Sequence, residues 1–136
     1  MTQLNAYLQF NGQCREALTF YKECLGGELY LQKVAESPMA AQMSSEVGAN
    51  ILHGYLTRNG TIIIMGSDMM GARLKPGNSV SLCLSCSSTE EINSFFDKLS
   101  VGGVVKMPLH QSSWGSTYGE LTDRFGMTWM LNYAKN

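Results

Sequence analysis

Charge and long apolar runs are what this sequence has least of. Charged residues make up 15% of its 136 residues, and the formal net charge is −1. Lys and Arg are scattered along the chain, so the basic patch that marks a nucleic-acid-binding protein is missing. No apolar run approaches the roughly 20 residues that a membrane-spanning helix needs. The first residues lack the basic and apolar parts of a signal peptide, so we expect a cytoplasmic protein that binds neither nucleic acid nor membrane.

The chain has four cysteines. Cys83 and Cys86 have the spacing of zinc and redox motifs, but they lie in an alternating apolar stretch. Residues three apart on a strand point to opposite faces, so these two thiols would share no ligand site. We therefore expect reduced, half-buried cysteines.

The first half predicts a strand, a helix and three further strands. Apolar residues alternate with polar ones from Leu4 to Phe10, which is typical of a strand with one buried face. Apolar residues then recur at helical spacing from Cys14 to Leu25. Gly26-Gly27 ends that helix, because glycine adopts the left-handed turn of a helix end. Strands are expected at residues 28–36, 51–57 and 61–65, and loops at 38–48 and 68–78. Asn59-Gly60 is the strongest short-range signal of a hairpin.

The second half repeats this order. A strand is expected around Val80 to Leu84, followed by a capping box of Ser88 and Glu91 at a helix start. The apolar side chains of this helix follow at i, i+3, i+4 and i+7, namely Ile92, Phe95, Phe96 and Leu99. Gly102-Gly103 ends it, as the first Gly-Gly pair ends the first helix. The last strands are expected at residues 104–109, 118–122 and 128–133.

An internal repeat of this kind suggests one structural unit used twice. We expect an α+β fold in a single domain, with one βαβββ module at about residues 1–68 and a second at about 79–136. Together they would form a curved, mostly antiparallel eight-stranded sheet with helices outside and a cleft inside, where a small molecule would bind. A closed ferredoxin-like domain without a cleft is the alternative.

Several segments together resemble a known family. They are Tyr7–Gly12, Cys14–Ala17 with Phe20-Tyr21, His53 with Ser67-Asp68, Phe96–Leu99 with Gly102-Gly103, Met107–Leu109, Trp114-Gly115 and Gly119–Met130. This set spans nearly the whole chain and resembles the PhnB-like branch of the glyoxalase/bleomycin-resistance/dioxygenase (vicinal oxygen chelate) superfamily. The resemblance implies paired βαβββ modules and, commonly, a homodimer. It implies less about chemistry, because the superfamily includes isomerases, thiol transferases, dioxygenases and drug-sequestering binders. Some members carry a methyltransferase label, but no glycine-rich nucleotide-binding loop follows a strand in this sequence.

The resemblance also allows a test for a metal site. Metal-dependent members hold one divalent ion with His and carboxylate side chains from the first and last strands of each module. Aligned on the resemblance, those positions hold Ala6, a residue near Ile64, Ser81 and Met130. Aliphatic side chains and a hydroxyl cannot compete with water for a hard divalent ion. We therefore expect no metal and no cofactor, and a binding protein is favoured over an enzyme.

Other residues with reactive side chains have structural interpretations. His53 lies in an expected strand and His110 in an expected loop, and hydrogen-bonded or surface roles are expected for both. Asp68 ends a strand and Asp123 begins a turn, where a short carboxylate satisfies backbone amides. A nucleophilic pair of Cys83 and His53 stays open as an alternative.

The candidate ligand-binding residues are those expected to line the cleft. They are Leu8, Ser81, Cys83, Trp114, Tyr118 and Met130, with Met69 and Met70 on a nearby loop. Aromatic rings give a large flat contact area and methionine adapts its shape, which suits a planar or amphipathic small molecule. The alternative is that these side chains pack the core or a dimer interface, above all Trp114 and Trp129.

Two functions of different classes follow. The first is a metal-free protein that binds an unknown small molecule, similar in logic to the bleomycin-resistance members. The alternative is a metal-dependent lyase, isomerase or thiol transferase with an atypical ligand set. A purely structural homodimer is a third hypothesis. Because natural sheets rarely leave long edges uncovered, we expect a two-fold homodimer in each case.

Overall fold

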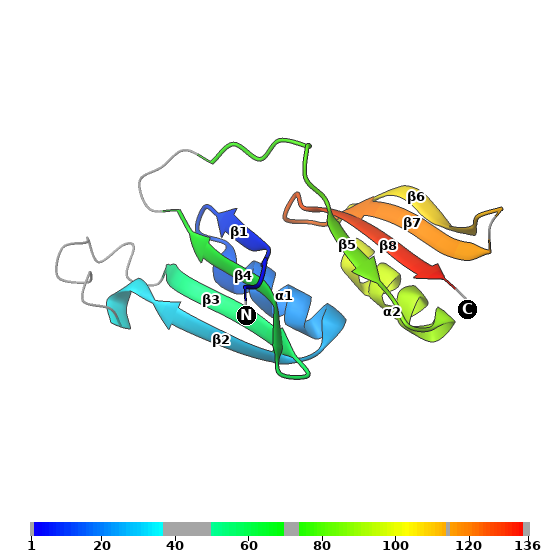
Figure 1. Ribbon diagram of the computed structural model, residues 1–136. Helices are drawn as coiled ribbons and strands as arrows, with labels where there is room; N and C mark the ends of the chain where they lie inside the picture. The colour runs from blue at the N-terminus through cyan, green and yellow to red at the C-terminus, as the bar shows by residue number, and fades with distance from the viewer. Residues whose placement is uncertain (1, 37–49, 70–73, 114, 135–136) are drawn as a thin grey trace. The chain divides into compact units, whose positions relative to one another are not determined.

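The computed structural model describes residues 2–36, 50–69, 74–113 and 115–134. The chain divides into two compact units, Met1–Lys75 and Pro76–Asn136. Each unit holds one βαβββ module, which Figure 1 shows with its elements labelled. The predicted α+β class and the predicted pair of modules are therefore confirmed. The eight strands lie in two sheets of four, and each unit is described by itself.

The first unit contains sheet A, with strand order β1-β4-β3-β2. Its elements are β1 (Tyr7–Phe10), α1 (Cys14–Leu25), β2 (Glu28–Lys33), a short 3-10 turn η1 (Val34–Glu36), β3 (Ile51–Arg58) and β4 (Thr61–Asp68). β1 pairs with β4 in parallel, and the β2–β3 and β3–β4 pairs are antiparallel. The hairpin between β3 and β4 turns at Asn59 and Gly60, both with positive φ, as the sequence predicts.

The second unit contains sheet B, with strand order β5-β8-β7-β6. Its elements are β5 (Leu82–Ser85), α2 (Thr89–Ser100), β6 (Val104–Gln111), β7 (Ser116–Thr122) and β8 (Thr128–Ala134). β5 pairs with β8 in parallel, and the other two pairs are antiparallel. The order of strands and the place of the parallel pair match sheet A, so the repeat seen in the sequence is a repeat of topology.

Several strand bounds predicted from the sequence were wrong, at strand ends as well as at strand starts. β1 begins at Tyr7 rather than Leu4, and the Leu4 side chain is 99% exposed. β5 begins at Leu82, and Val80 is 77% exposed. In these two strands the apolar alternation continues past the residues that have a hydrogen-bonded neighbour, whereas β4, β6 and β7 extend beyond their predicted bounds. His110, expected in a loop, lies in β6.

The predictions for the loops and for the burial of the cysteines had different outcomes. The loop expected at residues 38–48 lies outside the described residues, and so does part of the loop expected at 68–78. The four cysteines are thiols. The expectation that they are half-buried fits only Cys86, because Cys14 and Cys24 are buried in helix packing and Cys83 is exposed.

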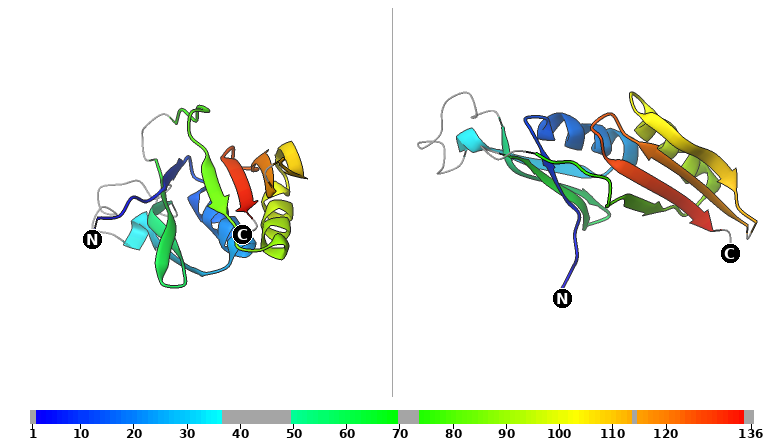
Figure 2. Two further views of the ribbon diagram at one scale, coloured as in Figure 1. Left: turned by 45° about the vertical axis from the view of Figure 1, so that its right-hand side comes forward. Right: turned by 90° about the horizontal axis from the view of Figure 1, so that it is seen from above.

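One amphipathic helix packs against each sheet, as Figure 2 shows in two further views. In the first unit, Leu18 of α1 and Leu56 of β3 are fully buried, so the core lies between α1 and sheet A. Gly54 of β3 allows the close approach, because a Cβ there would come within 2.7 Å of Leu31 Cδ2 and 2.9 Å of Leu18 Cδ1. A larger residue there would force the Leu31 and Leu18 side chains to shift.

The second unit also has a glycine where its helix approaches its sheet. A Cβ at Gly119 of β7 would come within 2.8 Å of both Leu109 Cδ2 and Phe96 Cε2. Helix α2 begins at the predicted cap, since the Ser88 hydroxyl accepts the Glu91 amide at 3.0 Å. The Glu91 carboxylate reaches one residue further back than a standard capping box, to the amide of Ser87 at 3.0 Å.

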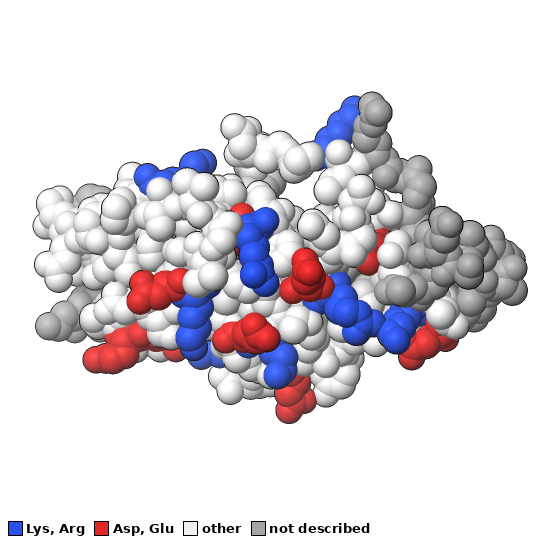
Figure 3. All heavy atoms as spheres, turned by 180° about the vertical axis from the view of Figure 1, so that it is seen from behind, with Lys and Arg blue, Asp and Glu red and all other residues white. Residues whose placement is uncertain are grey.

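Neither helix is a candidate for a membrane span. Within the described part of the chain, no helix combines the length and the apolar character needed to cross a bilayer. Figure 3 shows acidic and basic side chains interspersed on one face of the molecule. This mixture agrees with the formal net charge of −1.

Candidate functional site

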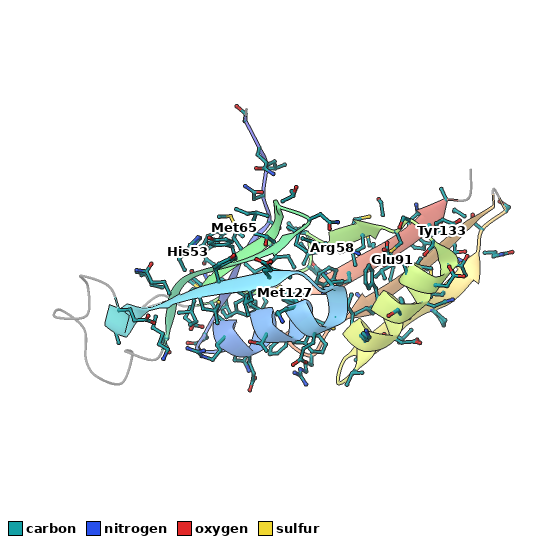
Figure 4. All side chains as sticks on the ribbon, turned by 90° about the horizontal axis from the view of Figure 1, so that it is seen from below. His53, Arg58, Met65, Glu91, Met127 and Tyr133 are labelled. Atoms are coloured by element: carbon teal, nitrogen blue, oxygen red, sulfur yellow. The ribbon has the colours of Figure 1, made fainter. Side chains whose placement is uncertain are left out.

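Each sheet has one face against its helix and one face away from it, which we call its open face. On the open face of sheet A, strand register places one residue of each strand side by side: Tyr7 beside Met65, Met65 beside Tyr55, and Tyr55 beside Tyr30. His53 is two residues before Tyr55 and therefore points the same way. Figure 4 shows His53 and Met65 on the side of the sheet away from α1.

Four rings on this open face form a continuous aromatic row, which consists of Tyr7, His53, Tyr55 and Tyr30. Tyr7 stacks on His53 with centroids 5.8 Å apart, and the Tyr7 hydroxyl lies 3.3 Å from His53 Nδ1. His53 is tilted against Tyr55 at 5.9 Å, and Tyr55 stacks on Tyr30 at 5.0 Å with 23° between the planes. These are offset geometries that aromatic pairs favour. The row presents ring faces and edges across three strands without burying them against the helix.

A carboxylate lies at the β2 end of the row. The Tyr30 hydroxyl donates a hydrogen bond to Glu28 Oε2 at 2.9 Å. This bond to the carboxylate, and then the negative charge itself, raise the pKa of Tyr30 above its ordinary value. The hydrogen bond orients the Tyr30 phenol beside Glu28.

The same corner of sheet A is hollowed. A pocket of about 730 Å³ lies there, and its lining consists of Gly27, Glu28, Tyr30, Tyr55, Thr57, Asn59 and Gly60. That volume falls in the range of roughly 300–1,000 Å³ typical of small-molecule sites. Gly27 is required at the rim, because a Cβ there would collide with the carbonyl oxygen of Thr57. The pocket thus joins two stacked tyrosine rings with one carboxylate.

The open face of sheet B brings together three of the residues expected in the cleft. Cys83 lies beside Met130, and Met130 lies beside Glu120, across strands β5, β8 and β7. Tyr118 is two residues before Glu120, and its hydroxyl donates to Glu120 Oε2 at 3.1 Å. Partial burial, followed by this bond, raises the pKa of Tyr118. The ring of His110 meets the Tyr118 ring edge-on at 6.2 Å.

The other expected cleft residues do not join this group in the structure. Leu8 pairs with Gly66 and lies on the helix-facing side of sheet A, whereas its neighbour Tyr7 lies on the open face. Ser81 is exposed just before β5, and Met69 is half-buried just after β4. Trp114 and Met70 lie outside the described residues.

The aromatic row and the two carboxylates of the open faces were not predicted from the sequence. The sequence does contain a signal for these pairs. In Glu28-Leu29-Tyr30 and again in Tyr118-Gly119-Glu120, a tyrosine and a glutamate are two residues apart on one strand. Residues two apart on a strand share a face, so each tyrosine and its glutamate were placed to meet. Which face they occupy could not be read without the register.

The donor set does not fit a divalent metal ion. Within the described ranges, no three His, Cys, Asp or Glu side chains are grouped so that they could hold an ion. The aligned positions Ala6, Ser81 and Met130 offer a methyl group, a hydroxyl and a thioether, which are poor ligands for hard cations. His53 and Cys83 lie in different units, and their pairing as a nucleophile stays a prediction.

Both candidate aspartates have the structural roles expected of them. Asp68 is 3% exposed, and its two oxygens accept the backbone amides of Cys14 at 2.9 Å and Ile51 at 2.8 Å. Asp123 Oδ1 accepts the amide of Phe125 at 2.8 Å within its own turn, and Oδ2 accepts the indole N–H of Trp129 at 2.8 Å. Trp129 is buried, so its predicted place in the core is confirmed.

Comparison with known proteins decides the family. The model of a family described as 3-demethylubiquinone-9 3-methyltransferase matches residues 2–132. Protein YjdN of Escherichia coli (strain K12) is 33% identical over 140 residues, covering 97% of this chain and 95% of YjdN. The chain belongs to this PhnB-like family. The resemblance identified from the sequence is thereby confirmed.

Solved structures of related proteins share the fold of this chain. Protein PA1353 from Pseudomonas aeruginosa is 33% identical, with all of both chains covered and a TM-score of 0.88. A putative 3-demethylubiquinone-9 3-methyltransferase, PhnB protein, from Bacillus cereus is 24% identical, with 98% of this chain and 100% of that chain covered and a TM-score of 0.73. Members of the glyoxalase/bleomycin-resistance/dioxygenase superfamily share the fold at lower identity.

Proposed function

We propose that this PhnB-like protein binds a small planar or amphipathic molecule without the help of a metal ion. The observation that carries the proposal is the aromatic row beside the pocket of about 730 Å³ in the first unit. Tyr7 and Tyr30 are 45% and 47% exposed although both carry large rings. Exposed apolar surface arranged next to a concavity is typical of a binding site.

We propose the open face of sheet B as a binding surface of the second unit in its own right. Met130 and Cys83 add soft, adaptable surface, and Tyr118 adds a ring held by Glu120. We keep Ser81 and Trp114 as proposed ligand contacts, and we drop Leu8 because its side chain lies on the helix side of sheet A. The family description names methyl transfer, but this sequence has no glycine-rich nucleotide-binding loop after a strand, so binding is the function that we propose.

A ligand panel tests the proposal. Planar aromatic, amphipathic and cationic compounds at up to millimolar concentration would be screened by thermal shift and by tryptophan fluorescence. A compound present at a hundred times its Kd should stabilise the fold by about 2.7 kcal/mol. We expect stabilisation by at least one class, weaker in Tyr55→Leu than in the wild type and unchanged by EDTA. No shift with any class would refute the proposal, and stoichiometric metal whose removal abolishes binding would refute its metal-free part.

We also propose that the protein works in the cytoplasm as a homodimer. Thiols at all four cysteines suit a reducing compartment. β6 is an edge strand of sheet B and exposes Val104, Val105 and Met107, and exposed apolar edge strands are usually covered. Sedimentation equilibrium at micromolar concentration should give twice the chain mass of 15.0 kDa. A species of one chain mass would contradict the dimer.

A further inference from the structure

We propose that the pocket lined by β2, β3 and the β3–β4 turn recognises the alkylammonium group of a small organic cation. The inference rests on the proposed binding function and names its ligand class. It depends on one juxtaposition: the Glu28 carboxylate lies beside the stacked rings of Tyr30 and Tyr55 in the lining of a single pocket.

The charge of the lining comes from one side chain. Of the seven lining residues, three are glycine or asparagine at the rim and hairpin turn, two are tyrosine and one is threonine, and only Glu28 carries a formal charge. A carboxylate repels an anionic ligand and attracts a cation over several ångströms in this half-open setting. The bond from the Tyr30 hydroxyl holds Glu28 Oε2 against the pocket wall, so the charge has a fixed position.

The tyrosine rings add a second attraction for the same charge. The face of an aromatic ring is electronegative and attracts cations within about 6 Å of its centroid. Tyr30 and Tyr55 are offset with centroids 5.0 Å apart, and Tyr30 is 47% exposed, so ring surface remains available to a ligand.

The contacts that the pocket lining can make favour an alkylammonium group over a metal cation. A hard metal ion needs several oxygen ligands around it, and this lining supplies one carboxylate. A quaternary ammonium group needs none, because its methyl groups contact ring faces and its charge is spread over them. The ring surface and the single carboxylate therefore match a large, soft cation.

Choline and its neutral isostere 3,3-dimethylbutan-1-ol are the probes that separate charge from shape. Titration of the full-length protein, followed by NMR, should show choline binding about tenfold more tightly than the isostere, within the range expected of cation–π and carboxylate contacts. Added salt should weaken choline binding and leave the isostere unchanged. Equal affinity for the two probes, or no binding of choline, would overturn the inference.

Variants assign the effect to named side chains. Glu28→Gln should lower choline affinity about fivefold or more without changing the binding of the isostere, and Tyr55→Leu should weaken choline to a similar extent. Tyr30→Phe keeps the ring and the carboxylate but loses the hydroxyl that orients Glu28, so choline affinity should fall less than in Tyr30→Leu, which also loses the ring. Glu28→Gln with wild-type affinity for choline would refute the role of its charge.

Glu23→Gln is the matched control. It removes the same charge from the same unit, but Glu23 is exposed on α1, on the opposite side of sheet A from the pocket. Its choline affinity should equal that of the wild type, and a loss equal to that of Glu28→Gln would refute a specific site. If neutral aromatic compounds stabilise the protein while choline does not bind, the ligand class is wrong and the binding function stands. If no compound binds, both fail.

Discussion

The carboxylate of Asp68, at the end of β4, accepts the backbone N–H of Cys14, the first residue of α1, at 2.9 Å. Its other oxygen accepts the N–H of Ile51, the first residue of β3, at 2.8 Å. The N-cap residue of α1, Gln13, makes no side-chain capping bond. Asp68 therefore caps the helix from a distant strand, and its negative charge lies at the positive end of the helix dipole.

Asp68→Ala should destabilise the protein strongly. Two backbone amides in a buried setting lose a charged acceptor, and each such bond contributes about 1.5–3 kcal/mol. We expect a loss of about 3 kcal/mol in the free energy of unfolding, measured by urea denaturation followed by circular dichroism. Asp97→Asn, at an exposed position of α2, should change stability by less than about 0.5 kcal/mol. Equal effects of the two substitutions would contradict the capping role of Asp68.

Asp68 also shows which contacts can be predicted from the sequence and which cannot. Its position at a strand end predicts a carboxylate that satisfies backbone amides, and that role is confirmed. Its partner Cys14 lies 54 residues away, and no local rule identifies a contact of that range. Helix bounds were predictable because 3.6-residue periodicity, the Ser88 cap and the Gly-Gly stops are all local.

A second buried carboxylate, Asp123, orders the β7–β8 turn. Asp123→Ala removes the acceptor of the Phe125 and Met127 amides and of the Trp129 indole, at 2.8, 3.0 and 2.8 Å. We expect a loss of about 2–4 kcal/mol in the free energy of unfolding. A double-mutant cycle with Trp129→Phe should give a coupling energy of about 1–3 kcal/mol.

The cycle should be followed by far-ultraviolet circular dichroism, because one substitution removes a tryptophan. Additive effects of the two single substitutions would mean that the indole bond adds nothing to stability. Since Asp123 and Trp129 flank one hairpin, the unfolding transition should remain cooperative in each variant.

Three glycines of the sheets provide a graded test of the packing. Gly54→Ala and Gly119→Ala each place a methyl group within 2.9 Å or less of two apolar side chains, and we expect each to cost about 1–3 kcal/mol by overpacking. Gly66→Ala is the milder control, because its nearest contact is 3.1 Å from the Leu8 carbonyl oxygen. Urea denaturation should rank Gly66→Ala as the smallest loss. The opposite order would contradict the matched helix packing of the two units.

The candidate site was harder to predict than the fold. Period-two alternation places Tyr7 and Gln9 on one face of β1 and Leu8 on the other, but it does not say which face the helix covers. Register supplies that information, and it assigns Leu8 to the helix side and Tyr7 to the open face. The row from Tyr7 to Tyr30 crosses strands that are distant in the sequence, so only the paired sheet reveals it.

The Cys14 thiol should make stability fall in alkaline solution. Burial, and then the negative charge of Asp68, raise the pKa of Cys14 from 9.0 to about 12. Below pH 9 the thiol is protonated in both the folded and the unfolded chain, so it has no effect on the pH dependence. Between pH 9 and about 12 the unfolded chain releases the proton and the folded chain retains it, so rising pH favours unfolding.

Cys14→Ala isolates this effect, because it removes the titrating group and leaves every other one in place. Between pH 8 and pH 10 the wild type should lose about 1 kcal/mol more stability than Cys14→Ala, since one proton corresponds to about 1.4 kcal/mol per pH unit. Urea denaturation across this range measures the difference in slope, which is independent of the packing lost with the sulfur. Parallel curves for the two proteins would show that Cys14 ionises as readily in the folded chain as in the unfolded one, and that the buried contact with Asp68 does not hold its proton.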